Sequence, residues 1–163
     1  MGLDMEIRHN GEEAIYMRKV NCVRKWCAEN LENFKDNGLT NFPKEKFREL
    51  IGTMRKTIIE SGLSNIYGYY QCIQDGRFED DDWDLYKEVR AFLEVEENRE
   101  RLTNAANRLF PSSSGFFFGS TEYNEWYVVD LITFCYKFIE FYEELENSGE
   151  EWDEGTVEYW EWY

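Results

Sequence analysis

The sequence contains one histidine in 163 residues, and this scarcity narrows the catalytic chemistry that the chain can support. That residue, His9, has polar neighbours in what we predict to be an N-terminal loop. The spacings G-x-S-x-G, G-x-G-x-x-G, H-E-x-x-H and C-x-x-C and the P-loop pattern are also missing. The sequence therefore lacks the usual signatures of a nucleophile, a phosphate loop, a zinc hydrolase or a redox thiol pair, and we expect no enzyme.

Long apolar runs are missing too. None approaches the roughly 20 residues that span a bilayer, and the N-terminus lacks the basic start and apolar stretch of a signal peptide. We therefore expect a cytoplasmic protein. The cysteines are widely spaced within apolar patterns, which is typical of reduced core residues; they are Cys22, Cys27, Cys72 and Cys135.

Basic residues are few: 18 Lys and Arg stand against 34 Asp and Glu, a formal net charge of −16. Direct binding to DNA, RNA or an anionic membrane is disfavoured, because it depends on Lys and Arg neutralising phosphates. Residues 1–60 hold 11 basic and 10 acidic side chains, whereas residues 61–163 hold 7 and 24. The negative charge is therefore local, and it favours encounter with a basic partner.

Aromatic residues, in contrast, are abundant. With 12 Phe, 11 Tyr and 6 Trp, the chain has enough apolar area for one folded domain over residues 1–163, and disorder is disfavoured.

Apolar residues at steps of three and four predict two helices in residues 1–62, packed as an antiparallel pair. The first covers residues 13–34, and the second follows Asn41 and Pro43 and ends at Gly62. The polar side of the first helix carries the densest basic cluster of the chain: Arg18, Lys19, Arg24 and Lys25.

Residues 63–111 are predicted to be an acidic helical insertion. Residues 63–78 have helical spacing, but their tyrosines and the Asp75-Gly76 pair would also suit a hairpin, so a short helix is favoured and a hairpin stays open. Two further helices are predicted over residues 82–96 and 98–109, and Pro111 ends the second.

Residues 112–146 combine a Phe-rich plug with the longest predicted helix. Three phenylalanines between two glycines predict a short buried strand over residues 115–119. Thr121 is predicted to cap a helix over residues 122–146 that is apolar nearly all round. Such a helix is buried centrally or by a partner.

The tail, residues 147–163, is acidic and aromatic together, and residues 156–163 are a candidate edge strand beside the Phe-rich plug. The predicted fold class is therefore mainly α: a single-domain bundle of four to six helices with a small β element, formed by residues 115–119 and the candidate strand 156–163.

The densest acidic run covers residues 79–84. Asp80, Asp82 and Asp84 alternate as in the first half of a calcium-binding loop. Leu85 and Ala91, however, stand where such a loop needs glycine and a bidentate glutamate. We therefore predict no metal and no cofactor, and interpret the run as a helix N-terminus rich in acids, which the helix dipole favours.

Two acidic regions, residues 79–84 and 143–161, are candidates for polyanion mimicry, in which carboxylates on a rigid surface occupy the Lys- and Arg-lined groove of a nucleic-acid-binding protein. Trp and Tyr within them supply contact area at low entropic cost. In the competing interpretation, the tail aromatics complete the domain's own core while its carboxylates face solvent or pair with the basic cluster. The candidate partner-binding residues are Glu79, Asp80, Asp81, Asp82, Asp84, Glu143, Glu144, Glu146, Glu150, Glu151, Trp152, Asp153, Glu154, Glu158, Trp160, Glu161 and Trp162.

Two segments of the chain resemble small bacteriophage and prophage proteins of unknown function. One is Gly115-Phe-Phe-Phe-Gly-Ser-Thr-Glu-Tyr-Asn-Glu-Trp-Tyr127; the other is Tyr16-Met-Arg-Lys-Val-Asn21, followed by Trp26. The chain has Met17 and Val20 where those proteins have Trp and Ala, and residues 63–100 look like an insertion. The resemblance implies a phage setting and mostly helical structure, and it transfers no catalytic residues.

Phage settings are rich in acidic proteins that disarm host defences, including anti-CRISPR and anti-restriction proteins. The resemblance therefore favours an acidic binding protein, a DNA mimic, that blocks a basic nucleic-acid-handling protein in the host cell cytoplasm. The alternative is a structural or regulatory phage protein that forms a homodimer, or joins another phage protein, through the apolar helix 122–146. A carboxylate-based, metal-assisted enzyme is a third hypothesis.

Overall fold

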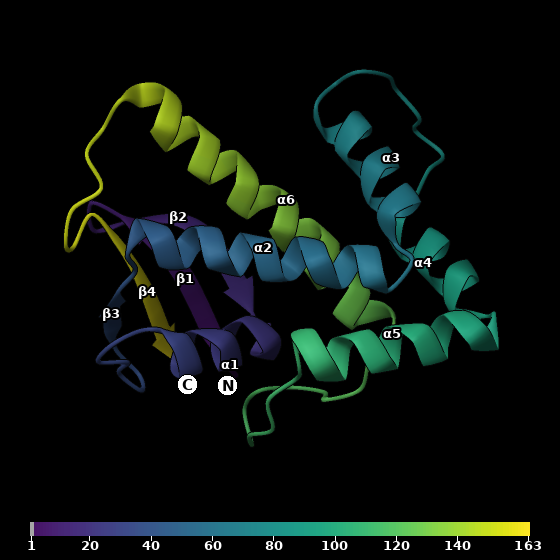
Figure 1. The fold of residues 1–163 in the computed structure, drawn as a ribbon, viewed down its shortest axis with the longest axis horizontal. Helices are drawn as coiled ribbons and strands as arrows, with labels where there is room; N and C mark the ends of the chain where they lie inside the picture. The colour runs from purple at the N-terminus through teal and green to yellow at the C-terminus, as the bar shows by residue number, and fades with distance from the viewer. Residues whose placement is uncertain (1) are drawn as a thin grey trace.

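A computed structural model describes residues 2–163, and in them six helices pack against a four-stranded antiparallel sheet (Figure 1). The strands are β1 (Asp4–His9), β2 (Glu12–Arg18), β3 (Leu39–Asn41) and β4 (Val157–Trp162). The helices are α1 (Asn21–Asn30), α2 (Lys44–Glu60), α3 (Ser64–Gln74), α4 (Leu85–Leu93), α5 (Glu96–Leu109) and α6 (Glu125–Ser148). Helices dominate as predicted, but the β element is a full sheet rather than a small addition.

The first helix predicted from the sequence is wrong over its first third. Residues 12–18 are strand β2, which forms a hairpin with β1 through Asn10 and Gly11, both at positive φ (51° and 82°). Asn-Gly is the strongest short signal for such a turn. The alternation of buried Ile15 and Met17 with exposed Tyr16 is that of a half-buried strand. Of the first predicted helix only α1 is helical, so residues 1–62 contain two helices, α1 and α2, together with strands β1, β2 and β3.

The tail forms strand β4, and it lies inside the sheet instead of at its edge. The strand order is β2-β1-β4-β3, so β4 pairs with β1 on one side and β3 on the other. Residues 115–119 form no strand, which corrects the prediction of a buried strand there. Both edges of β1 are already occupied, and the segment contacts the sheet only near its end, where Leu3 N–H donates to Phe117 O at 2.9 Å. Phe118 is buried, but Phe116 is 94% exposed.

The other predicted helices are confirmed, with shifted ends. Residues 64–74 are helical, which decides between the helix and the hairpin. Asn41 belongs to β3 and does not cap α2. Thr121 does not cap α6; Asn124 does, because its side-chain oxygen accepts from the backbone N–H groups of Trp126 and Tyr127.

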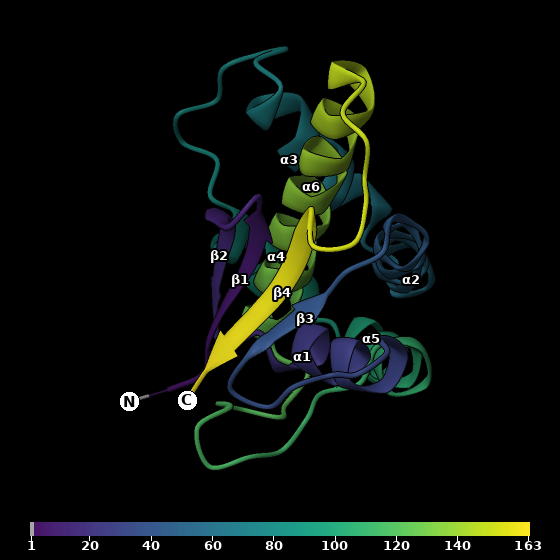
Figure 2. The ribbon, with the colours of Figure 1, turned by 90° about the vertical axis from the view of Figure 1, so that its left-hand side faces the viewer.

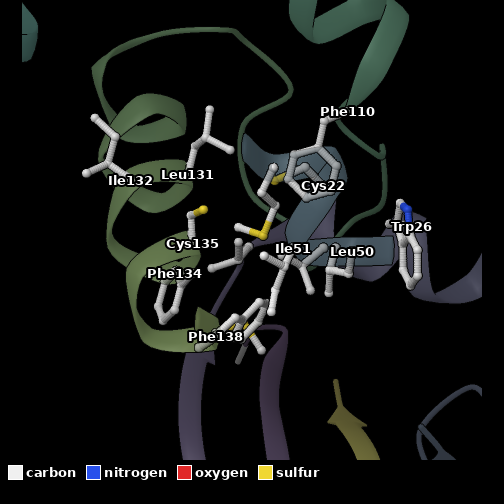
Figure 3. Packing of buried hydrophobic residues seen from close by; sticks show 14 of the residues in the cluster. Cys22, Trp26, Leu50, Ile51, Phe110, Leu131, Ile132, Phe134, Cys135 and Phe138 are labelled. Carbon is white, nitrogen blue, oxygen red and sulfur yellow. The ribbon is translucent and has the colours of Figure 1, made fainter. Parts of the chain in front are cut away.

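Helix α6 runs through the middle of the structure, and ten of its residues are buried. Figure 3 shows Leu131, Cys135 and Phe138 of α6 turned toward Leu50 and Ile51 of α2. One hydrophobic cluster joins residues from all six helices and the sheet. Most of the apolar circumference of α6 is therefore covered by its own chain, and Trp126 near its N-terminus is the large apolar side chain that stays exposed.

The helices cover one face of the sheet only. In Figure 2 none of the described helices lies in front of the strands, and the opposite face points toward the viewer. Met5, Ile7 and Tyr159 point into the core and are fully buried, whereas Tyr16 is 44% exposed and Trp162 58% exposed on the open face. The molecule thus has two distinct sides, an open sheet and a layer of helices.

Candidate functional site

The tail residue Glu161 is buried and bound to the chain's own residues. Its side chain is fully buried, and its two carboxylate oxygens accept from Arg24 Nε at 3.1 Å and Nη2 at 3.2 Å. Tyr159 Oη donates to the same carboxylate at 2.8 Å, and the Asn37 backbone N–H at 3.3 Å. The interpretation in which tail carboxylates pair with the basic cluster is confirmed at this residue.

Two further candidate carboxylates, Glu146 near the end of α6 and Glu150 in the tail, also bind the chain's own residues. Glu146 forms an ion pair with Lys44, the first residue of α2. Glu150 lies 2.9 Å from His9 Nε2 and accepts from Asn10 Nδ2 at 2.9 Å, which ties the end of α6 to the β1–β2 turn. His9 is therefore the last residue of a strand, with a carboxylate partner, rather than a residue of a loop.

The remaining candidates in the tail divide between core and solvent. Trp152 donates its Nε1–H to Phe42 O at 2.8 Å and packs on Phe47 and Phe141. The exposed acids of this region are Glu143, Glu144, Glu151, Asp153 and Glu154.

Glu158, Trp160 and Trp162 lie on the open face of the sheet. In the β1–β4 register Glu158 is opposite Arg8 and Trp160 is opposite Glu6. The same face carries the ion pairs Arg18–Asp4 at 3.2 Å and Arg8–Glu6 at 3.4 Å. The open sheet face is therefore aromatic with mixed charge, and it does not concentrate negative charge.

The acidic run at residues 79–84 lies in the α3–α4 loop (residues 75–84), and Tyr69 of α3 holds this loop in place. The Tyr69 ring packs against Phe78 and Trp83, with ring centroids 4.9 and 5.1 Å apart. Tyr69 Oη donates to Asp80 at 2.5 Å, and Asp84 caps α4 by accepting from Lys87 N at 3.2 Å.

The other acids of the run, Glu79, Asp81 and Asp82, are exposed. Within residues 2–163, none of the five acids between residues 79 and 84 takes part in an ion pair. The run at residues 79–84 is therefore held by aromatic contacts and hydrogen bonds, while its charge remains available; Asp75, at the start of the loop, lies 4.0 Å from Arg77.

A second acidic group lies on the other side of the α3 C-terminus. Asp75 accepts from Tyr136 Oη of α6 at 2.5 Å, and together with Glu140, Glu143 and Glu144 it lines a groove of about 230 Å³ between α3 and α6. Sequence reasoning singled out Glu143 and Glu144 but missed Asp75 and Glu140, because only the packing of α3 on α6 brings them together. We call this set the acidic surface: Asp75, Glu79, Asp80, Asp81, Asp82, Glu140, Glu143 and Glu144.

A cleft of about 400 Å³ opens at the N-terminus of α6, beside the start of α4. Trp126 lines it and is 61% exposed, and its ring lies 4.8 Å from that of Tyr86, two residues after the acidic run. Asp130 lines it as well, and burial raises the pKa of this carboxyl to about 7. The sequence feature that could have indicated this site is a single acid, Asp130, which stands four residues after Trp126 in an otherwise apolar stretch of helix.

No group of three or more His, Cys, Asp or Glu side chains in residues 2–163 is arranged to hold a metal ion. No helix in that range has the length and apolar character that crossing a membrane requires. No protein-family model matches the sequence, and comparisons with curated proteins and with solved structures find no match. The function is therefore argued from the surfaces themselves.

Proposed function

We propose that this chain is a non-enzymatic binding protein whose acidic surface docks on a basic, nucleic-acid-handling protein. The observation that carries the proposal is the α3–α4 loop, which presents Glu79, Asp81 and Asp82 without cationic partners while Tyr69 holds its backbone. Carboxylates presented in this way resemble the phosphates of a nucleic acid in charge and in accessibility. A groove lined with Lys and Arg is the surface that such an array attracts.

The rigidity of the loop matters because binding is weakened by every group that must be ordered on association. An acidic disordered segment would lose conformational freedom when it docked. In this loop, Asp80 and Asp84 accept hydrogen bonds from the fold itself, and Trp83 packs against α3. Part of the acidic run thus fixes the position of the rest.

The tail contributes less to this proposal than its composition predicts. Glu146, Glu150 and Glu161 are engaged with the chain's own basic or polar groups. The self-assembly alternative through helix 122–146 also loses support, because ten residues of α6 are already buried by the chain itself. The phage setting implied by the resemblance makes a host protein in the cytoplasm the proposed target.

The decisive experiment compares two triple variants of equal charge. One carries Glu79→Gln, Asp81→Asn and Asp82→Asn; the control carries Glu12→Gln, Glu32→Gln and Glu100→Gln, three exposed acids elsewhere. Each protein is immobilised and exposed to host lysate from about 50 mM to about 500 mM salt. Captured proteins are then tested for nucleic-acid binding and for its inhibition by the free chain.

We expect the wild type and the control to capture a nucleic-acid-binding protein in a salt-sensitive manner, and the loop variant to lose it. The free chain should displace nucleic acid from the captured protein. Capture that resists high salt, or that the loop variant retains, contradicts the proposal.

A further inference from the structure

The cleft at the N-terminus of α6 contains a carboxylate that the fold leaves without a partner. Asp130 is half-buried, yet within residues 2–163 it takes part in no ion pair and accepts no hydrogen bond from another side chain. A buried carboxylate ordinarily has such partners, because removing it from water is costly. An unpaired one at the wall of an open cleft is suited to receive a donor from outside.

The second wall of the cleft is aromatic. Trp126 lies one helical turn before Asp130, so the two side chains share a face of α6. The indole is 61% exposed although its neighbour Tyr127 is buried, and Tyr86 of α4 packs beside it at 4.8 Å. An exposed tryptophan next to a carboxylate offers both a π face and a charge to a cation.

The cleft also has two cationic residues in its lining, and both are directed elsewhere. Arg18 reaches Asp4 at 3.2 Å on the sheet. The stem of Lys19 lies along Gly119, and its Cε, like Arg18 Nη2, lies over Gly2. Burial alone accounts for the raised pKa of Asp130, and neither cation lowers it. The Asp130 carboxylate in the cleft therefore has no cation that neutralises it.

The cleft continues the side of the molecule that carries the acidic loop. Asp84 ends the acidic run and caps α4, and Tyr86 in the first turn of α4 connects the run to Trp126. The two segments that resemble the phage proteins also meet here: the Asn21 side chain donates to Phe118 O at 3.0 Å and to Ser120 O at 2.9 Å. Asn21 and Ser120 line the cleft together with Asp130, so these contacts fix part of its wall.

We propose that this cleft holds an arginine side chain of the basic partner, with the guanidinium hydrogen-bonded to Asp130 and packed against Trp126. The planar guanidinium donates two parallel N–H groups to a carboxylate and stacks on aromatic rings, whereas a lysine ammonium offers only a point charge. This inference rests on the proposed function: the acidic surface attracts the partner, and the cleft selects arginine over lysine.

Two pentapeptides of equal charge test the inference without knowledge of the natural partner. One has five lysines, and the other has a central arginine between four lysines. Their affinities for the full-length protein are measured by calorimetry at low salt. The variants are Asp130→Asn, which preserves the shape of the side chain, and Trp126→Leu, which preserves its apolar character; the loop triple variant described above is the control.

We expect the wild type to bind the arginine peptide about tenfold more tightly than the lysine peptide. The preference should disappear in Asp130→Asn and shrink in Trp126→Leu. The loop variant should weaken both peptides equally and keep the preference. Equal wild-type affinities, or a preference that survives Asp130→Asn, overturn the inference while leaving the proposed function intact. Failure of both peptides to bind overturns both.

The pH dependence supplies a second readout. Because Asp130 must be ionised to bind a guanidinium, the arginine preference should rise from about pH 6 to about pH 8, with proton release on binding. The other ionisable groups lining the cleft are Arg18, Lys19, Cys22, Glu122 and Tyr127. Burial raises the pKa values of Cys22 and Tyr127 well above neutrality. A preference that is flat with pH in the wild type contradicts the role of Asp130.

Discussion

The sheet side and the α3–α4 side of the molecule use their carboxylates in opposite ways. On the sheet, Asp4 lies 3.2 Å from Arg18, and Glu6 lies 3.4 Å from Arg8. In the α3–α4 loop, the acids at residues 79–84 take part in no ion pair within the described residues, and the fold holds them in place through uncharged groups. The density of acids in a sequence therefore does not by itself identify a binding surface, because pairing decides which charges remain available.

The difference in ion pairing also explains where along the chain the excess negative charge is left. The N-terminal residues supply cations to the tail, through Arg24 to Glu161, and to the end of α6, through Lys44 to Glu146. Strand β4 also lies between β1 and β3, so the first third of the chain and the tail form one sheet. The excess negative charge is left with the intervening helices and loops, where the basic partner is proposed to dock.

The largest effect is expected from breaking the buried pair on the sheet side. Arg24→Met leaves Glu161 fully buried without its cation, which should destabilise the fold by about 3–5 kcal/mol. Urea denaturation measures the loss. The double variant Arg24→Met/Glu161→Leu is the control and should recover much of it, because no unpaired charge remains. A loss below about 1 kcal/mol would show that the pair is solvated.

Asp130 is the intermediate case, since it is half-buried, whereas Glu161 is fully buried, and it is unpaired like the loop acids. Its pKa is about 7 in the folded state and about 3.9 in an unfolded chain, so the folded state binds the proton more tightly. The group's contribution to stability therefore falls as the pH rises from about 4 to about 7. Asp130→Asn should stabilise the protein by about 2 kcal/mol at pH 8 and by almost nothing near pH 4.

Urea denaturation of wild type and Asp130→Asn across this pH range measures the difference. Asp81→Asn, an exposed acid of the loop, is the matched control and should show no such trend. A stability difference that does not vary with pH would mean that Asp130 is solvated.

A smaller, local effect is expected from releasing the acidic loop. Tyr69→Ala removes the ring between Phe78 and Trp83 together with the hydrogen bond to Asp80. Backbone amides of residues 76–84 should then exchange their hydrogens faster, while those of α6 stay protected. Tyr16→Ala, the same change on the open sheet face, should leave loop exchange unaltered. Unchanged exchange in Tyr69→Ala would mean that other contacts hold the loop.

Helix α2 and most of α6 could be predicted from the sequence because buried apolar residues recur at helical spacing over many turns. The error at β2 has a local cause. Val20, Val23 and Cys27 of the α1 region extend backwards in steps of three and four to Tyr16, which is exposed on the sheet. The Asn10-Gly11 turn was the stronger signal, and it favours the hairpin.

The candidate site was predictable only in part. The acidic run at residues 79–84 is visible in the sequence, but whether an acid is paired depends on residues far along the chain, as with Glu161 and Arg24, which are 137 positions apart. The unpaired state of Asp130 likewise depends on Arg18 and Lys19 being directed toward Gly2. The spacing of residues along the sequence does not predict whether Glu161 or Asp130 is paired.

The smallest effects should differ in sign between the two sides. Asp4→Asn removes the partner of Arg18, so it should lower stability by a few tenths of a kcal/mol, about the value of an exposed ion pair. Asp81→Asn removes one charge from a cluster of like charges and should raise stability by a similar amount. Thermal unfolding at low salt measures both shifts, and added salt should reduce both because it screens exposed charges. If the two substitutions shift stability in the same direction, the loop acids are paired after all, and the contrast between the two sides fails.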